Sequence, residues 1–398
     1  MKQVAATGDV RGGRQRSPHM TEGRVVPYLR VANVFDGFID FSDVNEMAFK
    51  PNEIESFRLK AEDILLNEGQ SVELVGRCAM FVVGPEDCCF QNTLIRYRAG
   101  PDTSADFALQ LFRYCQAIGV FSKIAVKTNS IAHLGLSRFA ELELPFPPFP
   151  EQRKIAEILR TWDDAIEKLT ALRTANLSRR VWMRSHLFTG RTRLPSHAGA
   201  WRDVTLGQVL TEHRLQGTGA EEVFSVSVHK GLINQIEHLG RSFAAADTGH
   251  YNRVLPGDVV YTKSPTGEFP LGIVKQSKIA QEVIVSPLYG VFTPTTHALG
   301  VILDALFESP IAVRNYLHPL VQKGAKNTIA ITNRRFLEGK LRLPMDPAEQ
   351  AAIAEVATTT QAELACIDAE IDALTRQKRG LMQKLLTGEW RVKVEGTP

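Results

Sequence analysis

The chain carries the pattern Glu151-Gln-Arg-Lys-Ile-Ala-Glu-Ile-Leu159 and repeats it 198 residues later as Glu349-Gln-Ala-Ala-Ile-Ala-Glu-Val-Ala357. The same offset relates Leu187-Phe-Thr-Gly190 to Leu385-Leu-Thr-Gly388. Both ends of the repeat keep one offset, so no residue is inserted or lost between them. A continuous helix requires such a constant length, because one extra residue rotates everything downstream by about 100°. The repeat therefore predicts two equivalent long helices.

Residues between these landmarks recur at alternating steps of four and three, which is the heptad pattern of paired helices. In the second copy the series is Ile353, Ala357, Thr360, Leu364, Ile367, Ile371, Leu374, Lys378, Leu381 and Leu385. In the first copy it is Ile155, Leu159, Trp162, Ile166, Leu169, Arg173, Asn176, Arg180, Met183 and Leu187. Each helix would hold about 37 residues and extend about 55 Å. The shared register and length favour pairing of the two helices with each other over packing on two separate cores.

The stretches before the two helices also correspond, although more loosely. Short β-branched and aromatic runs broken by Gly, Asp and Pro predict strands, and residues 107–118 and 300–317 predict helices. Each half is therefore expected to be an α+β domain of about 150 residues followed by one long helix. The matching segments are 28–34 with 223–228, 57–65 with 251–260, 128–132 with 327–330, and the proline-bounded exits 144–148 with 343–347.

These repeated motifs resemble the conserved regions of the specificity subunits of type I restriction–modification systems. The shared string is a proline-rich exit, Glu-Gln, Ile-Ala, a long helix and Leu-x-Thr-Gly, and it occurs twice in one order. The blocks around Asp63 and Asp258 look like parts of that family's target-recognition domains. Any one motif is common, whereas the doubled set covers nearly the whole chain. One departure is the start: the second half opens on Trp201, whereas the first half matches only loosely, so we expect a trimmed first domain or a start further upstream.

The resemblance implies an α+β fold with an internal pseudo-repeat, in which the two long helices pair as an antiparallel coiled coil. The expected parts are a first target-recognition domain at 1–149, a first helix at 150–190, a second target-recognition domain at 191–346, and a second helix with a tail at 347–398. The implied function is sequence-specific binding of double-stranded DNA, with one half-site of a bipartite target read by each domain.

The resemblance also implies that the chain by itself is not an enzyme. It would be a component of a type I site-specific deoxyribonuclease and DNA methyltransferase complex. The implied partners are DNA methyltransferase (modification) subunits, two in number, and restriction/translocase subunits. No cofactor is expected in this subunit, because S-adenosylmethionine, ATP and Mg would belong to the partner subunits.

The motif content agrees with a non-catalytic chain. The sequence has no Gly-x-Gly-x-x-Gly and no Walker A phosphate loop. It lacks the Asn-Pro-Pro-aromatic loop of adenine methyltransferases, since Pro147-Pro148-Phe149 has no Asn before it. A metal-dependent nuclease needs spaced carboxylates, and none follows Pro101-Asp102 in the required pattern. No metal site is therefore expected.

Composition sets the class and compartment. The 398 residues suit two or three domains, and 44% hydrophobic residues with a net charge of +3 indicate globular cores on a nearly neutral protein. Five cysteines without a CxxC pair are typical of free thiols in a reducing compartment. No apolar run is long enough for a membrane span, and the N-terminus has no apolar signal core. We expect a cytoplasmic protein with no membrane partner.

DNA reading needs cations for phosphates and Asn, Gln or Arg for base edges. In the first half we expect a flexible basic loop around Arg11 to Arg16, a block at 30–33, and a strand-like run that places Asn92, Arg96 and Arg98 on one face. In the second half the candidates are scattered lysines with neighbouring Ser and Asn. The predicted DNA-binding residues are Arg11, Arg14, Gln15, Arg16, Arg30, Asn33, Asn92, Arg96, Arg98, Lys263, Ser264, Lys323, Lys326 and Asn327.

Three other interpretations stay open at this point. The chain could be the recognition subunit of a related restriction system with a different methyltransferase pairing. It could be a scaffold whose paired helices hold two ligand-binding domains without any DNA role. A free-standing nuclease is the third, and the missing metal carboxylates argue against it.

Overall fold

The computed structural model describes residues 1–15, 22–195, 197–239, 248–263, 265–323 and 329–393. The chain divides into two compact units, Met1–Leu169 with Glu370–Pro398, and Thr170–Ala369. The two predicted long helices are confirmed as α5 (Phe149–His186) and α10 (Pro347–Leu386), with 38 and 40 residues. Each unit contains about half of each long helix, so each can be described by itself.

Both units are built on a four-stranded antiparallel sheet with the same strand order. In the first unit the order is β2 (Gly8–Gly12), β9 (Leu94–Ala99), β5 (Asp63–Asn67) and β7 (Cys78–Phe81). In the second unit it is β14 (Leu210–Thr211), β21 (Gly290–Pro294), β18 (Val259–Tyr261) and β19 (Val274–Gln276). The predicted repeat of two α+β domains is thus confirmed at the level of topology.

One helix packs against each sheet, and its cap is repeated too. These helices are α2 (Ala105–Ala117) in the first unit and α7 (His297–Leu306) in the second. The hydroxyls of Ser104 and Thr296 each accept a hydrogen bond from the backbone N–H three residues on, which satisfies one of the free donors at a helix start. The predicted helix over 300–317 is in fact divided, because Ser309 caps a new helix, α8 (Pro310–Leu317), that begins on a proline.

Smaller elements complete the units. The first unit adds β1 (Lys2–Gln3), β3 (Arg24–Leu29), β4 (Asn45–Phe49), α1 (Pro51–Phe57), β6 (Gly69–Gln70), β8 (Cys89–Phe90), α3 (Val120–Ile124), β10 (Val126–Thr128), β11 (Ile131–His133), α4 (Leu136–Glu141) and β12 (Glu143–Leu144). The second adds β13 (Trp201–Thr205), β15 (Phe224–Ser227), β16 (Gly231–Asn234), α6 (Gln235–Leu239), β17 (Asn252–Val254), β20 (Val283–Val285), β22 (Gln322–Lys323), β23 (Ile329–Ala330), α9 (Asn333–Glu338) and β24 (Lys340–Pro344). Single 3-10 turns are η1 (Val4–Ala6), η2 (Val31–Asn33), η3 (Leu206–Gln208) and η4 (His318–Leu320).

The start of the first unit is shorter than its counterpart. Strand β1 pairs with β12 over two residues, whereas β13 pairs with β24 over five. The loose match of the first half to the motif opening at Trp201 therefore corresponds to a short edge pairing. The 3-10 turn that follows still buries Val4 completely, and Val4 joins the main core of the unit.

The aspartates of the repeated Asp63 and Asp258 blocks are structural. Each is almost fully buried and accepts a backbone N–H from three residues earlier, at 2.8 Å from Lys60 and 2.7 Å from Leu255. Asp63 also accepts two hydrogen bonds from Arg98, and Asp258 accepts one from Thr293. Because a buried carboxylate needs such partners, these residues fix the turn that leads into β5 and β18.

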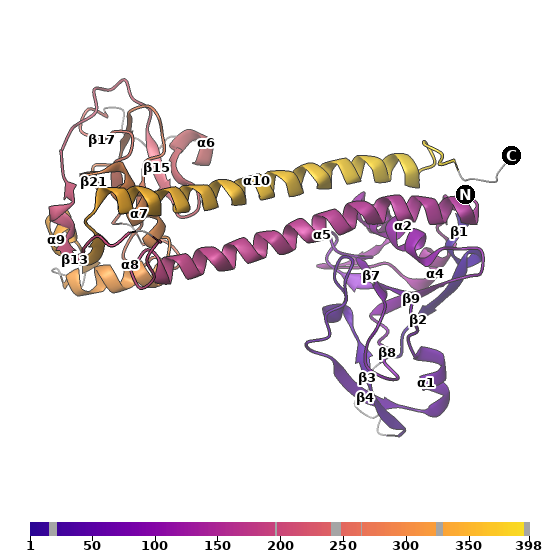
Figure 1. Cartoon of the computed structure of the whole chain (residues 1–398). Helices are drawn as coiled ribbons and strands as arrows, with labels where there is room; N and C mark the ends of the chain where they lie inside the picture. Colours follow the sequence, from indigo (N-terminus) through magenta and orange to yellow (C-terminus); the bar gives the residue numbers. More distant parts are fainter. Residues whose placement is uncertain (16–21, 196, 240–247, 264, 324–328, 394–398) are drawn as a thin grey trace. The chain divides into compact units, whose positions relative to one another are not determined.

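The long helices run antiparallel within each unit. In the first, Glu151 pairs with Arg391 and Asp163 with Lys378. In the second, Arg173 pairs with Asp368 and Arg179 with Glu363. The residue number thus falls along α10 as it rises along α5 (Figure 1). All of the predicted seam positions are buried or half-buried. Ion pairs from Arg173 and Arg180, and the buried amide of Asn176, explain why the first copy of the seam is interrupted by polar residues.

Candidate nucleic-acid interface

The ends of three strands meet at one edge of the first unit. The loop after β2 packs on the loop after β8, because Arg14 N donates to Phe90 O and Asn92 N donates to Arg14 O. Gln91 N donates in turn to Leu29 O, the last residue of β3. We call Arg14, Gln15, Gln91 and Asn92 the strand-end cluster. It joins two predicted site segments that lie about eighty residues apart in sequence.

The side chains of this cluster face outward to different degrees. Gln15 and Asn92 are exposed, whereas Arg14 is half-buried and pairs with Glu53 at 2.8 Å. Arg11 is also exposed, but it lies in strand β2 rather than in the predicted flexible loop, and its guanidinium donates to Ser56 O at 3.1 Å. Two amides and two guanidiniums at one surface are the groups that hydrogen-bond base edges and phosphates.

Two predicted DNA-binding residues are buried instead. Arg96 has a 2% exposed side chain, is paired with Asp9, and lies over the ring of Phe90. Burial and the neighbouring Arg98 lower the pKa of Arg96. Asn33 is also 2% exposed, and its amide donates to the carbonyls of Asp40 and Asp43. Arg96 therefore links strands β9 and β2, and Asn33 fixes the backbone at Asp40 and Asp43.

Two more of the predicted DNA-binding residues, Arg98 and Arg30, form ion pairs with carboxylates of this unit. Arg98 follows Arg96 on the same strand face, as alternation predicted, and binds Asp63 through two hydrogen bonds of 2.6 and 2.7 Å. These bonds raise the pKa of Arg98 despite its partial burial. Arg30 precedes Asn33 and lies 2.5 Å from the exposed Asp43.

The second unit offers fewer described candidates. Lys263 follows β18 and is exposed, although partial enclosure by the protein lowers the pKa of its ammonium group. Lys323 ends β22, and its side chain is not described. The remaining predicted residues lie outside the described part of the chain: Arg16, Ser264, Lys326 and Asn327.

A carboxylate on α5 fixes the first unit to the helix pair. Asp163 accepts hydrogen bonds from Gln110 of α2 at 2.7 Å and from Lys378 of α10 at 2.5 Å. Arg113 of α2 lies 3.7 Å away and also binds Asp36 with two contacts of 2.8 and 3.1 Å. Helix α2 of the domain therefore directs Gln110 and Arg113 at a carboxylate on α5, and α10 adds the ammonium group of Lys378.

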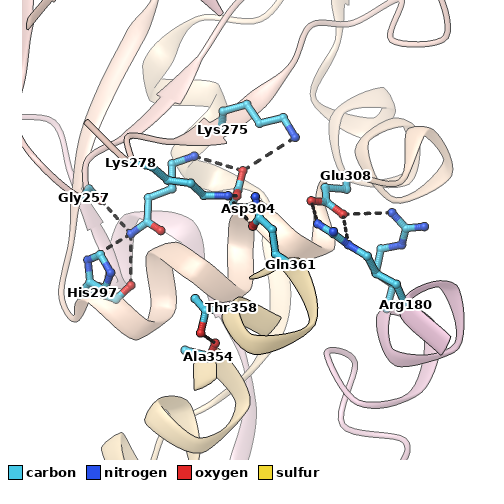
Figure 2. A network of polar contacts seen from close by, with 12 residues as sticks. Arg180, Gly257, Lys275, Lys278, His297, Asp304, Glu308, Ala354, Thr358 and Gln361 are labelled. Atoms are coloured by element: carbon cyan, nitrogen blue, oxygen red, sulfur yellow. Dashed lines mark hydrogen bonds and ion pairs between the residues drawn. The ribbon is translucent and has the colours of Figure 1, made fainter. Parts of the chain in front are cut away.

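In the second unit the charges are reversed. Figure 2 shows Arg180 of α5 facing Glu308, which follows α7. Arg184 lies 3.3 Å from the same carboxylate. Nearby, Lys278 bridges Asp304 of α7 at 2.9 Å and Gln361 of α10 at 2.8 Å (Figure 2). Here the domain supplies the carboxylates, and the long helix α5 supplies the guanidiniums.

The glutamate at the start of each long helix forms an ion pair with an arginine just beyond the end of the other long helix. Glu151 binds Arg391, beyond the end of α10, at 2.6 and 2.7 Å. Glu349 binds Arg193, beyond the end of α5, at 2.5 and 2.7 Å. The hydrogen bond from Arg391 is the main cause of the lowered pKa of Glu151. We call these two contacts the terminal ion pairs.

Sequence reasoning missed both arginines. Arg193 and Arg391 keep the offset of 198 residues that relates the two helices, so an extension of the repeat past Leu-x-Thr-Gly would have found them. The glutamines beside the glutamates are also explained. Gln152 accepts from Ser104 N, and Gln350 accepts from the hydroxyl of Thr296, so each links a long helix to a domain helix cap.

Residues 11–176 match the family described as the type I restriction modification DNA specificity domain. A relative from Methanocaldococcus jannaschii is 23% identical to this chain over 385 residues. It is described as the specificity subunit of the type I restriction enzyme MjaX. The match covers 92% of this chain and 88% of that protein. The chain thus carries a type I restriction modification DNA specificity domain at residues 11–176, and over most of its length it is similar to a type I specificity subunit.

Two solved structures share the fold of this chain. The S subunit of a type I restriction-modification system from M. genitalium has a TM-score of 0.56 and 16% identity, covering 97% of this chain and 95% of that one. A chain from a structure of the type I R-M system, described in terms of complex assembly and conformational transition, has a TM-score of 0.54 and 14% identity, covering 98% and 97%. At these identities the likeness concerns the fold.

The domain match and the relative similar over most of the chain support a role in DNA recognition, assembly with other restriction–modification subunits, and no catalysis by this chain itself. The non-DNA scaffold is not favoured. Within the described residues, no group of three or more His, Cys, Asp or Glu side chains is placed to hold a metal ion. None of the described helices is long and apolar enough to span a membrane.

We expect Asn92→Ala to relax recognition at a single base pair of one half-site. An exposed amide can bond a base edge in two places, and such a contact discriminates by about 1–3 kcal/mol. Asn92 uses its backbone, not its side chain, to bind Arg14, so the loop should keep its shape. Sequencing of methylated sites in cells that carry the variant would reveal the change. Loss of preference at several positions in both half-sites would contradict the assignment.

Proposed function

We propose that this chain reads a bipartite DNA target, with one half-site for each unit. The observation that carries the proposal is the repeat of the strand order β2-β9-β5-β7 as β14-β21-β18-β19. Two domains of one design on one chain suit a site of two separate parts. We assign target recognition to 1–149 and 191–346, and the connecting helices and tail to 150–190 and 347–398.

The geometry divides the predicted DNA-binding residues into groups. We propose that the exposed Arg11, Gln15, Asn92 and Lys263 contact DNA directly, with Arg14 beside them. Arg30 and Arg98 hold carboxylates, so they would contact DNA only by exchanging those partners. The buried Asn33 and Arg96 would support the reading surface from behind. The roles of Arg16, Ser264, Lys323, Lys326 and Asn327 rest on residue type alone.

We further propose that two modification subunits join each chain and bring S-adenosylmethionine. Restriction subunits would add ATP- and Mg-dependent cleavage. The same kind of terminal ion pair occurs in each unit, Glu151 with Arg391 and Glu349 with Arg193, and this repetition supports one docking position per unit. We place the assembly in the cytoplasm, where its DNA lies.

Replacing residues 201–342 by the same region of another specificity subunit tests the two-reader proposal. One half of the recognised sequence should change, and the other half should remain. The exchanged segment excludes Arg193 and Glu349, so the terminal ion pair of the second unit is kept. Methylation mapping in the host genome gives the readout. A simultaneous change of both half-sites in a folded chimera would rule out independent reading.

A further inference from the structure

Strands β10 and β11 form an antiparallel hairpin in the first unit, with the register Val126↔His133 and Thr128↔Ile131. The turn consists of Asn129 and Ser130, and Asn129 adopts a left-handed backbone with φ of 51°. Asn is among the few residues other than glycine that tolerate this conformation in a tight turn. We call residues 126–133 the ribbon.

The ribbon is exposed along its outer strand. All three residues of β10 are exposed, and β10 is the edge of the three-stranded sheet β10-β11-β6. Val126 and Ile131 are 50% and 46% exposed, which is unusual for β-branched residues in paired strands. Within the described part of the chain, the side chains of Asn129 and Ser130 make no hydrogen bond. An exposed edge of this kind needs either charges or a partner.

The sequence around the ribbon lacks negative charge. Of the 398 residues 44 are acidic, yet residues 107–140 contain none. Two other long stretches are acid-free, 168–202 and 309–337. The stretch 168–202 covers the second half of α5, and its arginines pair with carboxylates of α10 and Glu308. In contrast, Lys123, Lys127 and Arg138 near the ribbon form no ion pair within 4 Å among the described residues, although the charge of Lys127 contributes to the lowered pKa of Glu73.

The third acid-free stretch holds the equivalent hairpin of the second unit. Strands β22 and β23 pair antiparallel, with Lys323 opposite Ile329. They lie between η4 and α9, just as the ribbon lies between α3 and α4. Both hairpins therefore occupy one place in the repeat, and both lie in sequence without carboxylates. A surface feature that is repeated in each domain and whose own sequence contains no acidic residue suits a ligand that both domains share.

The ribbon is tied to the strand-end cluster through Glu68. Leu134 N, just beyond β11, donates to Glu68 O at 2.8 Å, and Glu68 N donates to Thr93 O at 2.9 Å. Thr93 directly follows Asn92. The side chain of Glu68 also contacts His133 of the ribbon at 3.1 Å. The ribbon and Asn92 are therefore connected through the backbone of a single residue, Glu68, which bonds Leu134 on one side and Thr93 on the other.

We propose that the ribbon enters a groove of the DNA beside the strand-end cluster, with Asn129 at base edges and Lys127 at a phosphate. The inference rests on the proposed DNA-reading function and deepens it. The major groove is about 12 Å wide and admits a two-stranded β-ribbon. The exposed methyl groups of Val126 and Ile131 would pack against sugars or thymine methyls. Neither Lys127 nor Asn129 was among the residues predicted from the sequence.

The test uses the full chain bound to its modification subunits, with two substitutions. Asn129→Gly removes the amide and keeps a residue that accepts the left-handed turn. It should reduce discrimination at one base pair of the first half-site by about 5- to 150-fold, with the second half-site unchanged. Lys127→Gln should weaken binding to every sequence and reduce the slope of log affinity against log salt by about one. Lys60→Gln, an exposed lysine away from the ribbon, is the matched control and should leave the slope unchanged.

The outcomes separate this inference from the proposed function. If replacement of residues 201–342 changes one half-site while both ribbon variants behave as wild type, the ribbon does not read DNA and the inference is overturned. If the ribbon variants lose modification subunits but keep their base preferences, the ribbon binds protein, which also overturns it. If domain replacement changes both half-sites together, the two-reader function itself fails. Thermal unfolding of each variant shows whether the unit remains folded.

Discussion

Inserting four residues into both long helices is expected to lengthen the spacer between the half-sites by one to two base pairs. The insertions go between Leu169 and Thr170 and between Ala369 and Glu370, where the two units meet. Four residues add about 6 Å and slightly more than one turn, so each seam still faces its partner. DNA rises about 3.4 Å per base pair. Mapping of methylated sites in cells that carry the lengthened chain measures the spacer.

The contacts inside each unit should survive these insertions. Asp163 stays on the same side of the insertion points as Lys378, and Arg173 stays with Asp368. Both half-site sequences should therefore be retained, with some loss of affinity, because each added base pair rotates one half-site by about 34°. One inserted residue per helix is the control and should be worse, since it turns the apolar seam away. An unchanged spacer in an active, lengthened chain would mean that helix length does not set it.

Glu349→Ala should lower the free energy of unfolding of the second unit by about 1–3 kcal/mol, the usual cost of leaving a buried hydrogen-bonding group without its partner. The side chain of Glu349 is fully buried and accepts two hydrogen bonds from Arg193 and one of 3.0 Å from Trp201 Nε1. Its loss leaves the indole N–H of Trp201 without an acceptor and leaves Arg193 with the Gly199 carbonyl but no carboxylate. Urea unfolding followed by circular dichroism gives the free energy.

The matched control is Glu363→Ala on the same helix. Glu363 pairs with Arg179, and both side chains are about half exposed, at 45% and 50%. Exposed pairs contribute about 0–1 kcal/mol, so this variant should unfold almost as the wild type does. Equal destabilisation by the two substitutions would show that burial of the terminal ion pair is not what stabilises the unit.

Much of the fold could be predicted because the repeat imposes length. The offset of 198 residues fixed both helices, and the heptad series identified buried positions such as Leu364 and Met183. The prediction of one helix over 300–317 was wrong because a helix cap within it was overlooked. Ser309 and Pro310 start a new helix inside the predicted helix over 300–317, and residues that cap a helix are recognisable only when the break is already suspected.

The candidate site was less accessible to sequence reasoning. Strand alternation was expected to put Asn92, Arg96 and Arg98 on one face, but Asn92 lies in the loop before β9 (Leu94–Ala99). Alternation also could not show that Asp9 and Asp63 from neighbouring strands meet the two arginines. Whether an arginine faces DNA or a carboxylate depends on residues far away in the chain. The ribbon was missed for the opposite reason. Lys127 and Asn129 belong to a short segment without a recognisable motif. Only the repeated hairpin and the absence of Asp and Glu from the surrounding sequence distinguish them.

The reversed charges at the two domain contacts make the two positions on the helix pair non-equivalent. Around α5, the first domain offers Gln110 and Arg113 to a carboxylate, and the second offers Glu308 to two arginines. The offset of 198 residues places Gln361 at the position of Asp163 and Arg180 at the position of Lys378, so a first domain moved to the second position would still face a cation but would lose the carboxylate that Arg113 meets now. Like charges held together away from water are costly. Evolutionary shuffling of recognition domains should therefore work between homologous chains at one position, while transposition within the chain needs compensating changes in the helices.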